Sequence, residues 1–229
     1  MKKSLKRIAI QLRREGYSYS EILKKVPVAK STLSLWLRSV NLTNSQKQKL
    51  TLKKLKSAKR GAEKRRLERI MKTREIIEKS ILDIKNISKE ELFLIGVVLY
   101  WAEGSKEKNY SSGVSVIFSN SDPLMCRLFL RWLKEIVGIE EKRISFEIYI
   151  HDNFKDKVSA ISEYWARETG FSISKFGKIY FKKSKTLTLR KNIAEGYHGL
   201  LRIRVRRSTD LNRKIKGWFY GICIRCGVV

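Results

Sequence analysis

The chain has 229 residues and a formal net charge of +29, with 51 Lys and Arg against 22 Asp and Glu. Apolar residues make up 42% and aromatic residues 10%, which excludes a globally disordered chain, and the two prolines exclude a Pro-rich or collagen-like one. Because such a charge excess repels itself, the composition predicts a polyanionic partner.

The chain lacks the patterns typical of secreted and membrane proteins. Residues 1–14 are basic but contain no continuous apolar region. The longest apolar run, residues 92–102, is too short to span a bilayer. Three cysteines are an odd number for a disulfide framework, and the lone Cys223-x-x-Cys226 pair is interpreted as helical thiols. We therefore expect no membrane partner and a cytoplasmic protein, associated with the nucleoid if the source is prokaryotic.

Residues 1–42 are predicted to form a domain of three short helices. Gly16 ends the first helix, Ser18 can cap the second, and a third runs from about residue 30 to 39. The stretch SYSEILKKVPVAKSTLSLWLR resembles the helix-turn-helix of resolvase-type and homeodomain-like DNA binders, except that Pro27 replaces a usual glycine and Ala29 a common Ser cap. The resemblance implies that the third helix reads double-stranded DNA; a three-helix module without a DNA role is the alternative. The implied DNA-binding residues are Lys30, Ser31, Thr32, Ser34 and Arg38.

Residues 43–86 are predicted to form a long basic linker helix. They contain fifteen Lys and Arg and only five acids, with no proline. Thr43 and Gln46 have the spacing of a capping box at its start. Two interpretations stay open: a solvated linker helix, or a basic arm that lies along phosphates and releases counterions.

Residues 87–229 are predicted to form a third domain, of α+β class, with an antiparallel sheet covered by helices on one face. Ser88 and Glu91 form a capping box before helix 89–103, and Asp122 with Pro123 begins helix 123–137. Further helices are expected over 153–169 and from the N-cap Ser208 to about residue 225. The expected strands are 114–119, 143–151, 178–183 and 201–206, with 186–190 as a further candidate.

The polar face of these strands is basic, with interleaved aromatic residues. An ordinary solvated sheet face is also polar but rarely carries so many cations with a single acid, so we expect this face to lie against a duplex and read base edges. The predicted DNA-binding residues here are Arg143, Ser145, Tyr149, His151, Lys178, Tyr180, Arg202, Arg204 and Arg206.

The helix LFLIGVVLYWAEGSK and the later corner FSNSDP resemble the core of LAGLIDADG homing endonucleases and their non-cleaving regulatory relatives, over roughly residues 89–225. The match departs at Val98, where the family has a small residue, although Gly96 lies two positions earlier. The resemblance implies that Glu103 is a catalytic residue and a ligand for a divalent metal, Mg²⁺, in phosphodiester hydrolysis.

The chain has one such helix, so the resemblance further implies a homodimer in which a two-fold axis supplies Glu103 twice. The implied dimer interface contains Gly96, Leu99 and Tyr100. Lys106 and Lys182 are candidates for the catalytic general acid or electrophile. The leading hypothesis is a site-specific endonuclease, and the alternative is a non-cleaving DNA-binding regulator of the same architecture. RNA binding through the basic sheet is a third hypothesis, against which the N-terminal helices argue.

Overall fold

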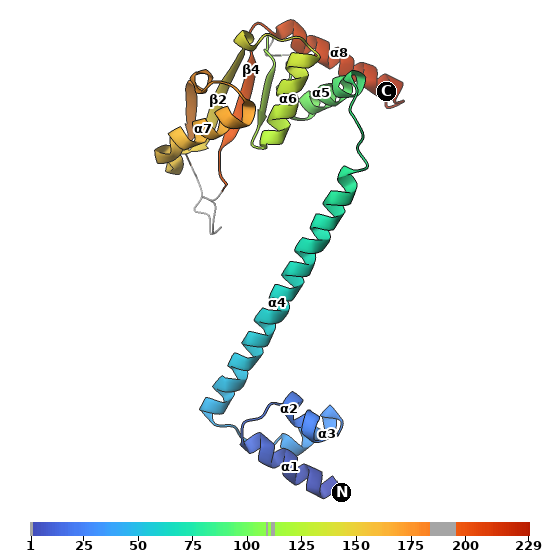
Figure 1. Cartoon of the computed structure of the whole chain (residues 1–229), viewed down its shortest axis with the longest axis vertical. Coiled ribbons are helices and arrows are strands. Elements are labelled where there is room, and N and C mark those ends of the chain that lie inside the picture. The colour runs from blue at the N-terminus through green and yellow to red at the C-terminus, as the bar shows by residue number, and fades with distance from the viewer. Residues whose placement is uncertain (1, 109, 111–112, 184–195) are drawn as a thin grey trace. The chain divides into compact units, whose positions relative to one another are not determined.

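The computed structural model describes residues 2–108, 110, 113–183 and 196–229, which form two compact units, residues 1–85 and residues 86–229 (Figure 1). The described part contains eight α-helices and a four-stranded sheet, so the α+β class is confirmed. The candidate strand 186–190 lies outside the described residues. None of the described helices has the length and apolar character that crossing a membrane requires.

The N-terminal unit begins with three short helices, α1 (Lys2–Arg14), α2 (Tyr19–Lys25) and α3 (Lys30–Leu37). Their buried apolar side chains form one core, built from Ala9, Leu12, Ile22, Val26, Leu33 and Leu37. Ser18 caps α2 within a full capping box, because its hydroxyl accepts from the Glu21 amide while Glu21 accepts from the Ser18 amide. Ala29 gives α3 no side-chain cap, as the sequence indicates.

The long helix α4 (Asn44–Ile81) has no buried residue. Its predicted capping box is confirmed, since the Thr43 hydroxyl accepts from the Gln46 amide and Gln46 Oε1 accepts from the Thr43 amide. The start of α4 contacts the short helices through Gln46 Nε2, which donates to the Arg14 carbonyl at 2.8 Å, and through Lys53 Nζ, which lies 2.8 Å from Glu21 Oε1. Most of the side chains of α4 are exposed.

The C-terminal unit has the helices α5 (Lys89–Glu103), α6 (Pro123–Glu135), α7 (Val158–Thr169) and α8 (Thr209–Arg225). The predicted caps of α5 and α6 are confirmed at Ser88 and Asp122. Ser208 does not cap α8: its hydroxyl donates to the Val205 carbonyl at 2.6 Å and accepts from the Val116 amide at 2.8 Å. Helix α7 begins later than predicted, because residues 152–157 form a 3₁₀ segment in which Phe154 departs from helical angles.

The sheet contains β1 (Ile117–Asn120), β2 (Ile144–His151), β3 (Lys178–Lys182) and β4 (Leu200–Val205), in the order β1-β4-β2-β3. Strand β4 is antiparallel to β1 and β2, but β3 is parallel to β2. The prediction of an antiparallel sheet is therefore wrong for β3: helix α7 carries the chain back, so that β3 starts beside the same end as β2. The strands' alternate residues, including Phe118, Phe146 and Ile203, share one core with α5, α6 and α7, and α6 and α7 lie over the sheet in Figure 1.

Candidate nucleic-acid interface

The side of the sheet away from this core, which we call the outer sheet face, carries most of the residues predicted to bind DNA. Its polar residues are Ser119, Ser145, Glu147, Tyr149, His151, Lys178, Tyr180, Lys182, Arg202 and Arg204, and the register also places the half-buried Ile117 and Leu200 on this side. The register places Ser119, Arg202, Glu147 and Lys178 in one row across all four strands, and Tyr149 beside Tyr180 in the next. Side-chain alternation thus brings together cations from strands that are distant in the sequence.

Glu147 lies at the centre of this face and is buried, with only 7% of its side chain exposed. Its Oε2 atom is 3.4 Å from Arg202 Nη1 and accepts from the Tyr149 hydroxyl at 3.1 Å. Its Oε1 atom is 3.4 Å from Arg204 Nε, an ion pair that lacks hydrogen-bond geometry. Arg202 also donates from Nε to Ser119 Oγ at 3.2 Å and from Nη1 to the Tyr149 hydroxyl. One carboxylate therefore connects two arginines and a tyrosine.

Tyr149 and Tyr180 stack on neighbouring strands, with ring centroids 4.7 Å apart and planes 14° from parallel. The Arg202 guanidinium lies 4.3 Å from the centroid of the Tyr149 ring, and Lys182 Nζ lies 5.3 Å from it. Burial, with a smaller contribution from the hydrogen bond to Glu147, raises the pKa of Tyr149, so its phenol stays protonated at neutral pH. Tyr180 remains 41% exposed and can contact a ligand.

Two predicted residues, Arg143 and Arg206, lie just outside the strands, whereas His151 ends β2 as expected. Arg143 precedes β2 in a 3₁₀ turn, and its guanidinium donates to the carbonyls of Arg206 and Arg207, at 3.1 and 2.8 Å. Arg143 thus connects the start of β2 with the segment that follows β4. Arg206 lies in that segment and is exposed. His151 is half-buried at the end of β2, and its Nδ1 has no hydrogen-bond partner in the described part of the chain.

The predicted metal ligand Glu103 is exposed at the C-terminal end of α5 and forms no ion pair within the described residues. Lys106 lies nearby, with Nζ 5.7 Å from the centroid of the Trp101 ring. Lys182 is on β3, at the opposite edge of the sheet from β1, with which Gly104 forms a bridge. The structure therefore keeps Lys106 near Glu103 and separates Lys182 from it. No cluster of three or more His, Cys, Asp or Glu side chains occurs among the described residues.

The predicted dimer interface is wrong, because the chain itself covers those residues. Leu99 and Tyr100 are buried in the core of the C-terminal unit, and Gly96 lies directly against the indole of Trp132 from α6. The exposed side of α5 instead carries Leu94 and Val98, which are 47% and 48% exposed. Next to it, Trp101 stacks on Phe219 of α8, with centroids 4.3 Å apart.

On α3, the five predicted DNA-binding residues lie on two sides of the helix. Ser31, Ser34 and Arg38 line one hollow together with Tyr19, whereas Thr32 lines another, beside Trp36 and the lysines of α1. Lys30 is exposed in the first turn. Sequence reasoning missed Leu35, which is 70% exposed on the side of Ser31 and Ser34. Its position outside the spacing of the core residues Leu33 and Leu37 is the signal that could have identified it.

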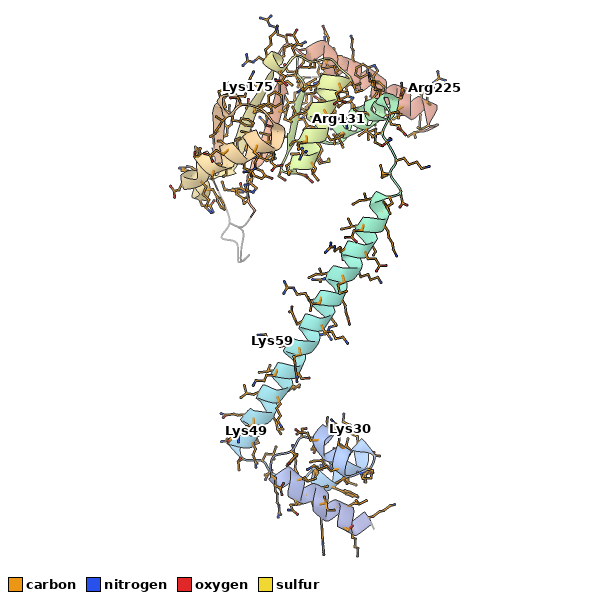
Figure 2. All side chains as sticks on the ribbon, viewed as in Figure 1. Lys30, Lys49, Lys59, Arg131, Lys175 and Arg225 are labelled. Carbon is orange, nitrogen blue, oxygen red and sulfur yellow. The ribbon has the colours of Figure 1, made fainter. Side chains whose placement is uncertain are left out.

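Basic side chains project along the whole of α4, as the labelled Lys49 and Lys59 illustrate in Figure 2. The first half of the helix, residues 44–62, contains seven Lys and Arg and no acid. All four acids of α4 lie in its second half, where three i,i+4 ion pairs form, among them Arg74 with Glu78 at 2.7 Å. The net positive charge of α4 is therefore concentrated in residues 44–62.

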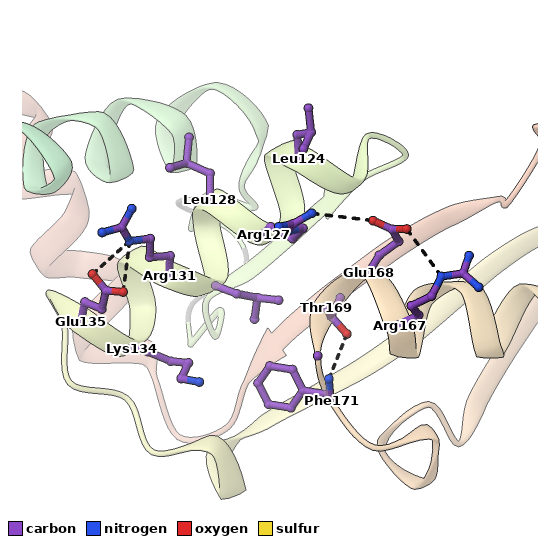
Figure 3. Close-up of a pocket in the computed structure, with 12 residues that line it drawn as sticks. Leu124, Arg127, Leu128, Arg131, Lys134, Glu135, Arg167, Glu168, Thr169 and Phe171 are labelled. Carbon is purple, nitrogen blue, oxygen red and sulfur yellow. Dashed lines mark hydrogen bonds and ion pairs between the residues drawn. The ribbon is translucent and has the colours of Figure 1, made fainter. Parts of the chain in front are cut away.

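The C-terminal unit also has a hollow of about 750 Å³ between α6 and α7, shown in Figure 3. Its cations already have partners: Arg131 donates to both oxygens of Glu135 at 3.0 Å, and Glu168 lies 3.9 Å from both Arg127 and Arg167. These pairs neutralise much of the charge of the hollow. The outer sheet face is therefore the stronger candidate for a polyanion.

Comparison with protein-family models, curated proteins and solved structures found no significant match to this chain.

Proposed function

We propose that the protein binds double-stranded DNA at specific sites. The observation that carries this proposal is the outer sheet face, where Arg202, Arg204, Lys178 and Lys182 surround a single buried acid. Four strands spaced about 4.8 Å apart span about 14 Å, so the face is wide enough to reach the phosphates on both sides of the major groove, which is about 12 Å wide. Arginine donors and tyrosine rings on such a surface suit base edges and phosphates together.

The N-terminal unit supports the same proposal. Helix α3 presents Lys30, Ser31, Ser34 and Arg38 on an exposed side, and the resemblance to helix-turn-helix proteins assigns this helix to the major groove. The acid-free half of α4 adds seven cations. A helix of 38 residues is about 57 Å long, so its first half alone can follow several phosphates.

We further propose that two copies of the chain form an endonuclease of the LAGLIDADG type. Glu103 is exposed and unpaired within the described part, and its carboxylate is a hard oxygen donor that suits Mg²⁺. One chain supplies too few ligands, so the residues fit a metal only when a second copy brings its own Glu103. When bound there, a divalent metal would stabilise negative charge on the phosphate oxygens and activate a water for hydrolysis.

The surface suited to that second copy is the exposed side of α5, not the buried side. Leu94 and Val98 are separated by one helical turn on the same side of α5, and Glu103 ends this helix. Tyr220 of α8, 48% exposed, lies beside Trp101 and extends the apolar surface. Pairing of two copies through this side would cover the exposed apolar side chains of both copies.

A non-cleaving DNA-binding regulator is the second candidate, and two observations favour it. Val98 places a branched side chain where close approach of two α5 helices requires a small one. Lys182 is at the far edge of the sheet, so only one of the two candidate lysines, Lys106, lies near Glu103. Such a protein would bind the same DNA without hydrolysing it.

Two measurements on the full-length protein test these proposals. If about six phosphates are contacted, the logarithm of the association constant for duplex DNA should fall with the logarithm of salt concentration with a slope of about −5. A slope near zero would contradict DNA binding. Incubation with supercoiled plasmid libraries should give nicked or linear products with Mg²⁺ and none with EDTA. Binding without cleavage in Mg²⁺ or Mn²⁺ would favour the regulator.

A further inference from the structure

An acid at the centre of a DNA-binding surface is unexpected, because a negative charge repels phosphate. Glu147 nevertheless lies at the middle of the outer sheet face, is almost fully buried, and engages both of its oxygens. A solvated carboxylate would need no such partners. The arrangement indicates that the useful property of Glu147 is its contact with Arg202, Arg204 and Tyr149 rather than its charge.

We propose that Glu147 is a positioning residue for sequence readout, which holds the guanidinium groups of Arg202 and Arg204 in fixed orientations towards DNA; this inference rests on the proposed DNA-binding function. Arg202 and Arg204 lie two residues apart on the same face of β4, and the register places Glu147 of β2 opposite Arg202. A single carboxylate can therefore orient both side chains from one side.

The two arginines keep donors for a ligand while Glu147 holds them. Arg202 uses Nε for Ser119 and Nη1 for Glu147 and Tyr149. In the part of the chain that the structure describes, no hydrogen bond occupies Nη2 of Arg202 or either terminal nitrogen of Arg204. Arginine is the side chain that most often reads guanine, through two parallel donors, and this contact requires a defined orientation of the guanidinium plane.

Tyr149 completes the support on the other side of Arg202. Its hydroxyl accepts from Arg202 and donates to Glu147, and its ring lies under the Arg202 guanidinium. Ser119 accepts from Arg202 Nε on β1. Arg202 is thus fixed by residues of the two neighbouring strands, β1 and β2, before any ligand arrives, so less conformational freedom is lost on binding.

For the substitution Glu147→Gln, the proposal predicts a change in affinity for the preferred duplex that is opposite in sign to the change expected from charge alone. Replacing Glu147 by Gln removes a negative charge, so electrostatics alone would strengthen binding to every duplex equally. If Glu147 positions the arginines, the same change should weaken binding to the preferred sequence while leaving binding to unrelated sequences unchanged or slightly stronger. The informative quantity is therefore the ratio of the two affinities.

The test begins with selection of a preferred duplex from a random library, using the full-length wild-type protein. Dissociation constants are then measured for that duplex and for a scrambled duplex of equal length and composition. Since a good bidentate arginine–base pair discriminates by roughly tenfold to a hundredfold, we expect Glu147→Gln to lower the affinity ratio at least about tenfold. Glu163→Gln, which removes an exposed acid from α7, is the matched control and should leave the ratio unchanged.

A second variant keeps the test decisive if Glu147→Gln does not fold. Tyr149→Phe removes only the hydroxyl that connects Arg202 with Glu147, and we expect the affinity ratio to fall about threefold or more, since that hydroxyl contributes one hydrogen bond to each neighbour. If Glu147→Gln folds and keeps the wild-type ratio of the two affinities, the positioning role is overturned while DNA binding stands. If Glu147→Gln does not fold, the same result for Tyr149→Phe would overturn the positioning role. A wild-type protein that selects no duplex would instead overturn the proposed function itself.

Discussion

Gly96 provides the sharpest test of how α5 is packed. A Cβ atom at this position would overlap the indole of Trp132, which is fully buried and has no room to move away. Overpacking of a tight core costs about 1–3 kcal/mol, and the rigid indole puts this site in the upper half of that range. Alanine gains about 1 kcal/mol over glycine in a helix interior, so Gly96→Ala should lose about 1–2 kcal/mol of unfolding free energy in total.

A loss of this size should be measurable as a lower melting temperature of the C-terminal unit. For a unit of its size, 1 kcal/mol corresponds to about 2–4 °C, so we expect a fall of about 2–8 °C. Four of the five tryptophans belong to this unit, so thermal unfolding can be followed by tryptophan fluorescence or near-ultraviolet circular dichroism.

Gly217→Ala is the matched control for this prediction. Gly217 lies in the interior of α8, and a Cβ atom there would meet no other atom within 4 Å. This substitution should therefore raise the unfolding free energy by about 1 kcal/mol. If Gly96→Ala stabilised the protein as much as Gly217→Ala, the packing of α5 against Trp132 would be refuted. If Gly96→Ala instead dissociated a dimer without changing the melting temperature, the result would support the dimer interface predicted from the sequence, in which Gly96 contacts the second copy.

Three further predictions concern the proposed site, the dimer and the pH dependence of the N-terminal unit. Glu103→Gln should reduce plasmid cleavage at least about a hundredfold while leaving DNA affinity unchanged or slightly stronger, and cleavage at the wild-type rate would place the chemistry elsewhere. Val98→Arg should convert a dimer into a folded monomer in light scattering, whereas Leu124→Arg, at an exposed position on α6, should not; an unchanged dimer would reject the α5 surface. The hydrogen bonds from Lys53 and Ser18 lower the pKa of Glu21 to about 2, so the stability that Glu21 contributes is complete above about pH 4.5 and is lost as pH falls through 2. Chemical unfolding between pH 7 and 2 should show a smaller acid-induced loss for Glu21→Gln than for the wild type.

The parts of the fold that depend on neighbouring residues could be predicted from the sequence. The cap at Ser18 and the capping boxes at Thr43 and Ser88 use side chains three residues apart, and the structure confirms all three. Strand alternation likewise identified the two faces of β2 and β4, because side-chain direction follows from position along a strand.

What could not be predicted depends on residues that are distant in the sequence. The parallel pairing of β3 follows from the path of α7, which strand patterns do not contain. The contact of Gly96 with Trp132 depends on which helix packs against α5, and helical spacing alone cannot identify that neighbour. The sequence identifies Glu147 as the single acid on a basic strand face. Its partners on β4 depend on the register of β2 with β4, which the sequence does not contain.

The exposure of α4 has a consequence for how the protein responds to a polyanion. Since none of the 38 residues of α4 is buried, this helix is supported mainly by local hydrogen bonds and ion pairs. The amide hydrogens of α4 should therefore exchange with solvent faster than those of α5. The fourteen cations of α4 far outnumber its four acids, so like charges repel one another along the helix. Phosphates that neutralise those cations would remove the repulsion, so binding of DNA and ordering of α4 are thermodynamically linked and each strengthens the other.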